Sequence, residues 1–140
     1  MVTTIGLIRH GVTEWNLLGK AQGSADISLN DVGRSQAERI GNRLSRGKIW
    51  DLIVTSDLPR AVETAKIIGS KINLSVSQSE KRIREIDCGQ IEGTTEKERE
   101  NRWGRNWRKL DLGMEKNESV AERGIEFLEE LVLTYSENEY

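Results

Sequence analysis

Near the N-terminus an apolar run stops abruptly at an arginine, a histidine and a glycine, in the stretch Ile5-Gly6-Leu7-Ile8-Arg9-His10-Gly11-Val12-Thr13-Glu14-Trp15-Asn16. Residues 2–9 carry little polar content before Arg9, which predicts a buried β-strand. Gly11 allows a tight turn directly after it. His10 is the only histidine among the 140 residues. A single histidine at a strand end is more often structural than catalytic, but the same pattern returns twice further along the chain.

The second apolar run, residues 49–55, also predicts a strand, and it ends in the polar sequence Ser56-Asp57-Leu58-Pro59-Arg60-Ala61. Ser56 or Asp57 can cap the helix that follows, and Pro59 suits the first turn of that helix. Small and apolar side chains recur there at helical spacing, at Ala61, Ala65, Ile68 and Ile72. The sequence therefore predicts a strand, a reactive turn and a helix.

Other segments complete an alternation of strands and helices. Asn30 is a suitable N-cap for a helix that runs to about residue 46. A weak third strand is predicted over residues 74–77, and residues 81–87 run through Ile83 and Ile86 with Glu85 between them. Residues 118–135 predict an acidic amphipathic helix, with an inward face made of Val120, Phe127, Leu128, Leu131 and Val132.

This order of elements predicts a parallel sheet built from right-handed crossovers. Ligands of such sheets bind beyond the carboxyl ends of the strands. The rule brings Arg9 and His10, the segment from Ser56 to Arg60, and Glu85 to the same edge. We therefore expect one α/β domain with a single site at this edge.

Composition narrows the function classes. The formal net charge of −2 gives no overall attraction to nucleic acids or anionic membranes. No apolar run approaches the roughly 18 residues that a membrane span requires, and the single cysteine, Cys88, cannot form an internal disulfide. The N-terminus lacks the pattern of a signal peptide. We therefore expect a cytoplasmic protein that binds neither membranes nor nucleic acids.

The chemistry of the predicted edge favours a phosphate. Arginine forks hold two oxygens at once, whereas two arginines and one histidine make a poor metal site. Neutral His10 beside Arg9 and Arg60 can act as a nucleophile, because nearby positive charge disfavours the protonated ring. Glu85 is the nearest candidate to donate a proton to the leaving group and then to activate water. A solvated strand-end charge is the simpler alternative for Glu85.

The first stretch resembles the Arg-His-Gly-x-Thr-x-x-Asn signature of the histidine phosphatase superfamily, the phosphoglycerate-mutase-like proteins. Further matches follow in the family's order, at Gln22-Gly23, Gly33, Gln36-Ala37, Ser56-Asp57-Leu58-Pro59-Arg60-Ala61, Thr64-Ala65, Arg84-Glu85-Ile86, Glu92-Gly93 and Glu118-Ser119 with Arg123. The resemblance implies a three-layer α/β/α fold with a mostly parallel sheet. It covers residues 1–140 as one domain.

The family's roles carry over residue by residue. His10 would become the phosphohistidine, Arg9 and Arg60 would bind the phosphoryl group, and Glu85 would be the acid and base. The remaining positions that the resemblance assigns to substrate and phosphate binding are Thr13, Asn16, Gln22 and Gly23. It implies a metal-independent phosphatase without a cofactor that acts on small phosphorylated metabolites, closest to the broad-specificity branch, with a phosphoglycerate mutase as an alternative. A homodimer is left open.

The resemblance breaks at the C-terminal end. Family members carry a second histidine in a Ser-His-Gly-type motif after the last helix, and this chain has no other histidine. We therefore expect a C-terminally incomplete domain that lacks the strand beside the Arg-His-Gly strand. An impaired relative that binds phosphorylated ligands without efficient turnover is the second interpretation. A third, single-strand nucleic-acid binding by the tryptophans and arginines of residues 102–109, is disfavoured by the acidic residues that follow.

Overall fold

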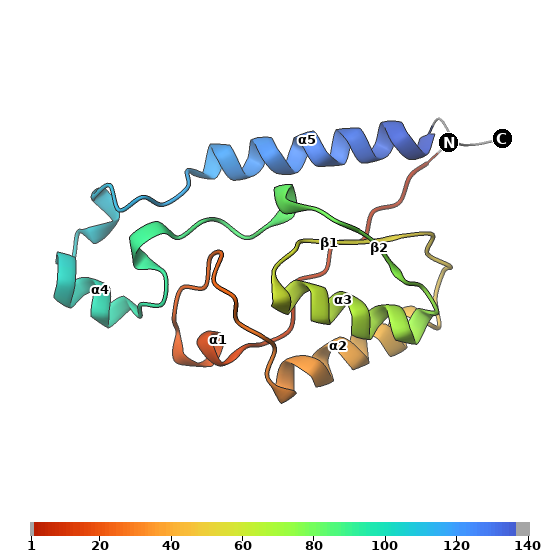
Figure 1. Ribbon diagram of the computed structural model, residues 1–140, viewed down its shortest axis with the longest axis horizontal. Coiled ribbons are helices and arrows are strands. Elements are labelled where there is room, and N and C mark those ends of the chain that lie inside the picture. Colours follow the sequence, from red (N-terminus) through yellow and green to blue (C-terminus); the bar gives the residue numbers. More distant parts are fainter. Residues whose placement is uncertain (1, 137–140) are drawn as a thin grey trace.

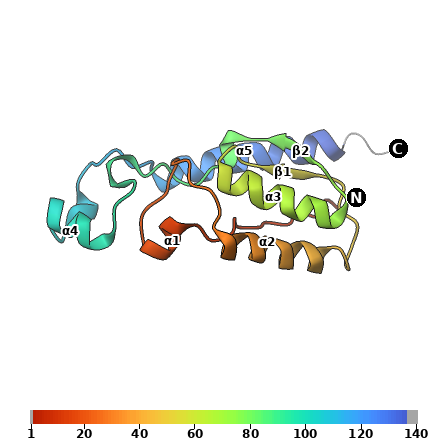
Figure 2. The same cartoon turned by 60° about the horizontal axis from the view of Figure 1, so that its bottom comes forward.

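Two short parallel strands lie between helices in the computed structural model, which describes residues 2–136 (Figure 1). The strands are β1 (Ile53–Thr55) and β2 (Val76–Ser79), and α3 (Pro59–Ile72) connects them. The long helix α5 (Asn117–Ser136) runs on one side of the strands, and α2 (Asp31–Leu44) packs with α3 on the other (Figure 2). The predicted α/β class with parallel pairing is confirmed.

The smaller elements lie around this centre. The short helix α1 (Glu14–Leu18) follows the Arg-His-Gly turn, and α4 (Glu96–Trp103) lies at the far end of the molecule from α2 and α3 (Figure 1). Single 3-10 turns occupy Lys81–Ile83, Gly89–Ile91 and Trp107–Lys109. The strands are shorter than predicted and begin later than residues 49 and 74, where the expected strands started.

The predicted strand over residues 2–9 is wrong. The segment belongs to no strand, and the side chains of Val2 and Leu7 are 86% and 85% exposed. Neither β1 nor β2 pairs with it, because these two strands pair only with each other. An apolar segment becomes a buried strand only when other segments supply its ladder hydrogen bonds and cover its side chains. No segment within residues 2–136 does so.

The N-cap residue of α2 is the one that the sequence predicted, whereas the N-cap residue of α3 is not. The Asn30 side chain accepts a hydrogen bond of 2.8 Å from the Gly33 N–H, as an N-cap residue should. At α3 the N-cap residue is Leu58, which offers no side-chain oxygen, so the prediction of Ser56 or Asp57 is wrong. Pro59 does occupy the first turn. The carboxylate of Asp57 instead binds Arg84, with N···O distances of 2.5 and 2.7 Å.

A small second core holds the segment between Glu85 and α5. The side chains of Cys88, Ile91, Trp107 and Leu112 are buried against one another. Two guanidinium groups lie over the Trp107 ring, those of Arg99 at 5.1 Å and Arg108 at 4.3 Å from its centre. Both arginines also pair with Glu96. Part of the basic charge of residues 102–109 is therefore neutralised within this end of the molecule.

Helix α5 buries one stripe of its surface. Phe127 is buried, whereas Val132 is 37% exposed, so its predicted inward position is wrong. The Phe127 ring lies under the Arg82 guanidinium at 5.4 Å. This contact joins α5 to the turn at Lys81–Ile83, which directly precedes Glu85. No helix within residues 2–136 combines the length and apolar character needed to cross a bilayer.

Replacing Phe127 by alanine should lower the free energy of unfolding by roughly 3–5 kcal/mol, because a buried aromatic side chain leaves a cavity behind. Urea denaturation followed by circular dichroism measures the change. Ile125→Ala is the matched control on the same helix, since Ile125 is 54% exposed, and it should change the stability by no more than about 0.5 kcal/mol. Equal effects of the two variants would contradict the burial of Phe127.

Candidate active site

The hydrogen bonding of His10 determines which ring nitrogen is free. Its Nδ1 lies 2.6 Å from the carbonyl oxygen of Gly11. A carbonyl oxygen can only accept, so Nδ1 must carry the proton. In the neutral ring the lone pair is then on Nε2. The His10 side chain is 11% exposed, so this nitrogen is the reactive atom of a largely buried imidazole.

Two helices hold the turn after His10. The Gly11 N–H donates to Thr64 Oγ1 of α3 at 3.1 Å, and the Val12 N–H donates to Gln36 Oε1 of α2 at 3.0 Å. The turn and α2 approach so closely that a Cβ on Gly11 would overlap the Gly33 backbone and a Cβ on Gly33 would overlap the Val12 backbone. The turn therefore packs directly on the first residues of α2, and side chains of both helices fix its amides.

Arg60 is fully buried at the base of the site, with 0% of its side chain exposed. Its guanidinium donates to the carbonyl oxygens of Ala25 at 2.8 Å and Gly23 at 2.5 Å, and to Glu85 Oε2 at 2.9 Å. Its Nε has no hydrogen-bond partner within the described part of the chain. A buried charge requires such partners, so Arg60 joins α3, the loop before α2 and the Glu85 segment.

Glu85 lies between the histidine and the arginine. Its Oε2 is 3.9 Å from His10 Nε2 and 2.9 Å from the Arg60 guanidinium. A hydrogen bond from the His10 ring, which requires a proton on Nε2, lowers the pKa of the Glu85 carboxyl, partial burial opposes this, and Arg60 lowers it further. The side chain is 37% exposed, so solvent reaches a carboxylate that directly faces the free ring nitrogen.

The other predicted site residues lie further from this group. Arg9 is exposed and borders a cavity on the α2 side of His10. Thr13 caps α1, and its hydroxyl is 2.5 Å from Gln22 Oε1, while Asn16 completes the capping box of the same helix. Gly23 joins the centre only through its carbonyl oxygen, which accepts from Arg60. His10, Arg60 and Glu85 are therefore in direct proximity, and the Thr13 side chain is hydrogen-bonded to those of Asn16 and Gln22.

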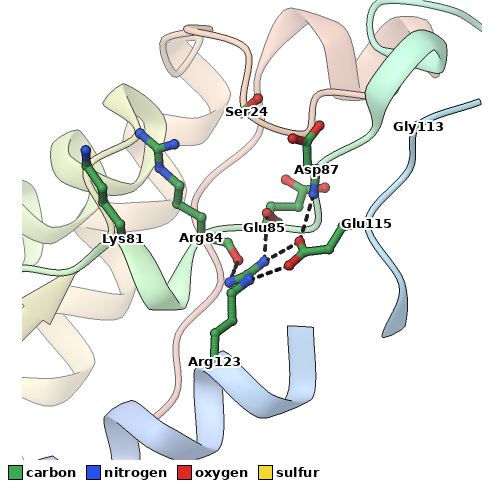
Figure 3. Close-up of a pocket in the computed structure, with 8 residues that line it drawn as sticks. All are labelled: Ser24, Lys81, Arg84, Glu85, Asp87, Gly113, Glu115 and Arg123. Atoms are coloured by element: carbon green, nitrogen blue, oxygen red, sulfur yellow. Dashed lines mark hydrogen bonds and ion pairs between the residues drawn. The ribbon is translucent and has the colours of Figure 1, made fainter. Parts of the chain in front are cut away.

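Two residues to which sequence reasoning assigned no role hold the Glu85 segment. Arg123 of α5 donates to the carbonyl oxygens of Arg84 at 2.7 Å and Glu85 at 3.2 Å (Figure 3). It also donates to that of Arg82 at 2.7 Å. Its guanidinium also pairs with Glu115 at 2.9 Å. Arg123 matched a motif, but no spacing rule connects it to a segment almost forty residues earlier.

An open cavity of about 330 Å³ adjoins Glu85, and Arg123, Glu115 and Ser24 are among the residues that line it (Figure 3). Arg84 and Lys81 also line it, from the turn before Glu85. The pKa of the Asp57 carboxyl is lowered by its hydrogen bonds to Arg84. Because Glu85 and Glu115 line the cavity together with Lys81, Arg84 and Arg123, its walls carry charges of both signs.

Removing the Arg123 guanidinium should release the carbonyl oxygens on both sides of Glu85. In Arg123→Gln we expect the carboxylate to move away from His10 and its pKa to rise toward the ordinary value. A carbon-detected NMR titration of the Glu85 carboxyl measures this change. Arg82→Gln is the control, because it removes ion pairs to α5 and leaves the Arg123 bonds intact. An unchanged Glu85 pKa in Arg123→Gln would show that Arg123 does not position it.

Glu115 should make stability depend on acidity. Hydrogen bonds from Arg123 and Ser119 lower its pKa to about 2. The carboxylate therefore stabilises the fold above the ordinary pKa near 4.5, and this contribution is lost as the pH falls from there toward 2. Chemical denaturation at several pH values should show a smaller acid loss in Glu115→Gln than in the unmodified chain. Glu118→Gln, in the first turn of α5, should retain the full loss; if it did not, the dependence would lie elsewhere.

Comparison with known proteins agrees with this geometry. The uncharacterized phosphatase PhoE of Bacillus subtilis (strain 168) is 38% identical over 122 residues, which cover 87% of this chain and 61% of the relative. The 2,3-bisphosphoglycerate-dependent phosphoglycerate mutase of Mesorhizobium japonicum is 30% identical over 132 residues, covering 89% and 64%. The chain thus spans about three fifths of the length of these relatives.

A solved structure has the same fold. The structure of mycobacterial glucosyl-3-phosphoglycerate phosphatase in complex with VO3 superposes with a TM-score of 0.80 and 31% identity, covering 89% of this chain and 62% of the other. The family model described as "Histidine phosphatase superfamily (branch 1)" matches residues 5–140, almost the whole chain. By this match, and by the order of its motifs, the chain belongs to the histidine phosphatase superfamily.

Proposed function

We propose that the chain is a phosphatase that hydrolyses small phosphomonoesters through a phosphohistidine on His10. The observation that carries the proposal is the placement of His10, whose Nδ1 lies against the Gly11 carbonyl oxygen and whose Nε2 faces Glu85 at 3.9 Å. Glu85 in turn is bound by the buried Arg60. A nucleophile, a proton carrier and a fixed positive charge are the groups that phosphoryl transfer through histidine requires.

In the first step, Nε2 attacks the phosphorus atom and the ester P–O bond breaks. The leaving alkoxide takes a proton from Glu85 in its protonated form. Arg60 and Arg9 bind the phosphoryl oxygens and stabilise the negative charge on them. The imidazole keeps its Nδ1 proton throughout, because the Gly11 carbonyl oxygen holds it.

In the second step, Glu85 acts as a carboxylate. It takes a proton from a water molecule, the water oxygen attacks phosphorus, and the P–N bond breaks to release inorganic phosphate and neutral His10. Glu85 regains in the second step the proton that it gave up in the first. No oxidation state changes in either step, so no redox partner is needed. Two guanidinium groups supply positive charge at the phosphoryl group, and we therefore propose that the reaction is metal-independent. We also propose a cytoplasmic protein, as the sequence analysis expects.

Two features of the site support these roles. The Nε–H of Arg60 is buried without an acceptor, and an unsatisfied buried donor costs about 1–3 kcal/mol, which a phosphoryl oxygen at that atom would recover. The pKa of Glu85 is held down by His10 and Arg60. A phosphate dianion between these groups would draw the positive charge to itself and raise that pKa, so substrate binding favours the acid form that the first step uses.

Mutase activity is the second candidate, because a phosphoglycerate mutase is among the relatives. It would use the same phosphohistidine, with transfer to a second hydroxyl group in place of water. Phosphate release and phosphoryl transfer between the two hydroxyl groups of phosphoglycerate separate the two activities. The exposed Glu85 carboxylate, which water can reach, favours hydrolysis.

The decisive experiment traps the intermediate. After rapid mixing with a ³²P-labelled aryl phosphate, acid-labile label should accumulate on the chain and be absent from His10→Ala. Glu85→Gln should slow release of the aryl alcohol by about 10²–10⁴-fold. Thr134→Ala, a change on the exposed surface of α5, should retain the full rate.

The same assay separates turnover from binding alone. Phosphate release that continues beyond one equivalent in a chelator supports a metal-independent phosphatase. Release that stops at one equivalent would identify a chain that is phosphorylated without efficient hydrolysis. No label on His10 under any condition, with the fold intact by circular dichroism, would refute the proposal.

A further inference from the structure

One planar peptide group, between Gly11 and Val12, connects the His10 ring to helix α2. Its carbonyl oxygen lies 2.6 Å from His10 Nδ1. Its N–H, which belongs to Val12, donates to Gln36 Oε1 at 3.0 Å. Resonance holds the atoms of a trans peptide group in one plane, with the carbonyl oxygen and the N–H on opposite sides. The bond to Gln36 therefore determines which of these two groups faces the imidazole.

The peptide groups on either side have other partners. The Gly11 N–H, in the preceding group, donates to Thr64 Oγ1 at 3.1 Å. The Thr64 hydroxyl donates its own proton to a backbone carbonyl oxygen of α3, so a lone pair remains for that N–H. The Val12 carbonyl oxygen, in the following group, accepts from the Asn30 N–H at 3.1 Å. In the described part of the chain, Gln36 is thus the side chain that holds the N–H of the group between them.

The opposite orientation of this peptide group would change the tautomer of His10. Turning the group over would place the Val12 N–H against Nδ1. Because an N–H can only donate, Nδ1 would have to be unprotonated, and the proton of the neutral ring would move to Nε2. Glycine at position 11 lacks the Cβ that restricts such a rotation. The nitrogen that faces Glu85 would then have no lone pair for attack on phosphorus.

We propose that Gln36 is a positioning residue of the reaction, which keeps the Gly11 carbonyl oxygen toward His10 and thereby keeps the lone pair on Nε2. Its side-chain oxygen binds the backbone and acts on the ring only through the peptide group. An amide oxygen accepts the Val12 N–H without adding negative charge beside the nucleophile, where a phosphate has to bind. The effect on catalysis rests on the function proposed above, whereas the effect on the tautomer does not.

NMR of the whole chain labelled with ¹⁵N-histidine measures the tautomer, because His10 is the only histidine. Long-range proton–nitrogen correlation at a pH where the ring is neutral distinguishes Nδ1–H from Nε2–H. The unmodified chain should show the Nδ1–H form. In Gln36→Leu the ratio of Nε2–H to Nδ1–H should rise by about tenfold or more, the scale for a buried donor left without an acceptor. Gln36→Glu retains the oxygen and should restore the Nδ1–H form.

Two controls separate the orientation of this peptide group from a general loosening of the turn. Thr64→Val removes the acceptor of the Gly11 N–H, which lies in the preceding group, so it should lower the stability and leave the tautomer unchanged. Gln90→Leu makes the same exchange at an exposed position and should change neither, and circular dichroism verifies that each variant folds. Equal tautomer shifts in Thr64→Val and Gln36→Leu would overturn the proposal, as would an unchanged tautomer in Gln36→Leu.

Turnover of an aryl phosphate is the second measurement. Because Gln36 acts on the nucleophile, Gln36→Leu should lower kcat in step with the share of the Nδ1–H form and leave KM nearly unchanged. A large loss of the Nδ1–H form with an unchanged kcat would refute the role of Gln36 in the reaction. If the unmodified chain formed no phosphohistidine, the proposed function would fail, and the tautomer shift in Gln36→Leu would still be seen.

Discussion

A guanidinium group without solvent exposure constrains the whole centre of this protein. Arg60 lies under the site on α3, and a charge removed from water must be surrounded by hydrogen-bond acceptors. The acceptors come from two separate segments, the carbonyl oxygens of Gly23 and Ala25 and the carboxylate of Glu85. Neither segment contains a strand, so their positions depend on this one side chain more than on a backbone ladder.

Arginine side chains, through hydrogen bonds and ion pairs, hold the segment around Glu85 in place where no sheet does so. The segment after β2 contains a single 3-10 turn, and Arg123 binds three of its carbonyl oxygens from α5. Arg84 anchors the same segment to Asp57, next to β1. Partly exposed pairs of this kind weaken with salt and acid. The site is therefore more sensitive to ionic conditions than one whose residues project from the ends of central strands.

The sequence predicted the helices better than the strands, for a physical reason. Asn30 and Pro59 are local signals, and they correctly mark the starts of α2 and α3. A strand also requires a partner, and residues 2–9 have none within the described chain. Strand-end reasoning nevertheless brought His10, Arg60 and Glu85 together. Arg123 could not be found in this way, because its bonds go to backbone atoms of a segment distant in the chain.

The turn at Gly11 connects an exposed N-terminal segment to the packed centre of the protein. Residues 2–9 are exposed and form no strand, whereas the amides of Gly11 and Val12 are each bound by a side chain from a different helix. The position of the imidazole beside this turn is therefore set by the two helices and not by the exposed segment before it. The reactive nitrogen of His10 is therefore positioned by α2 and α3, although in the sequence His10 directly follows the exposed residues 2–9.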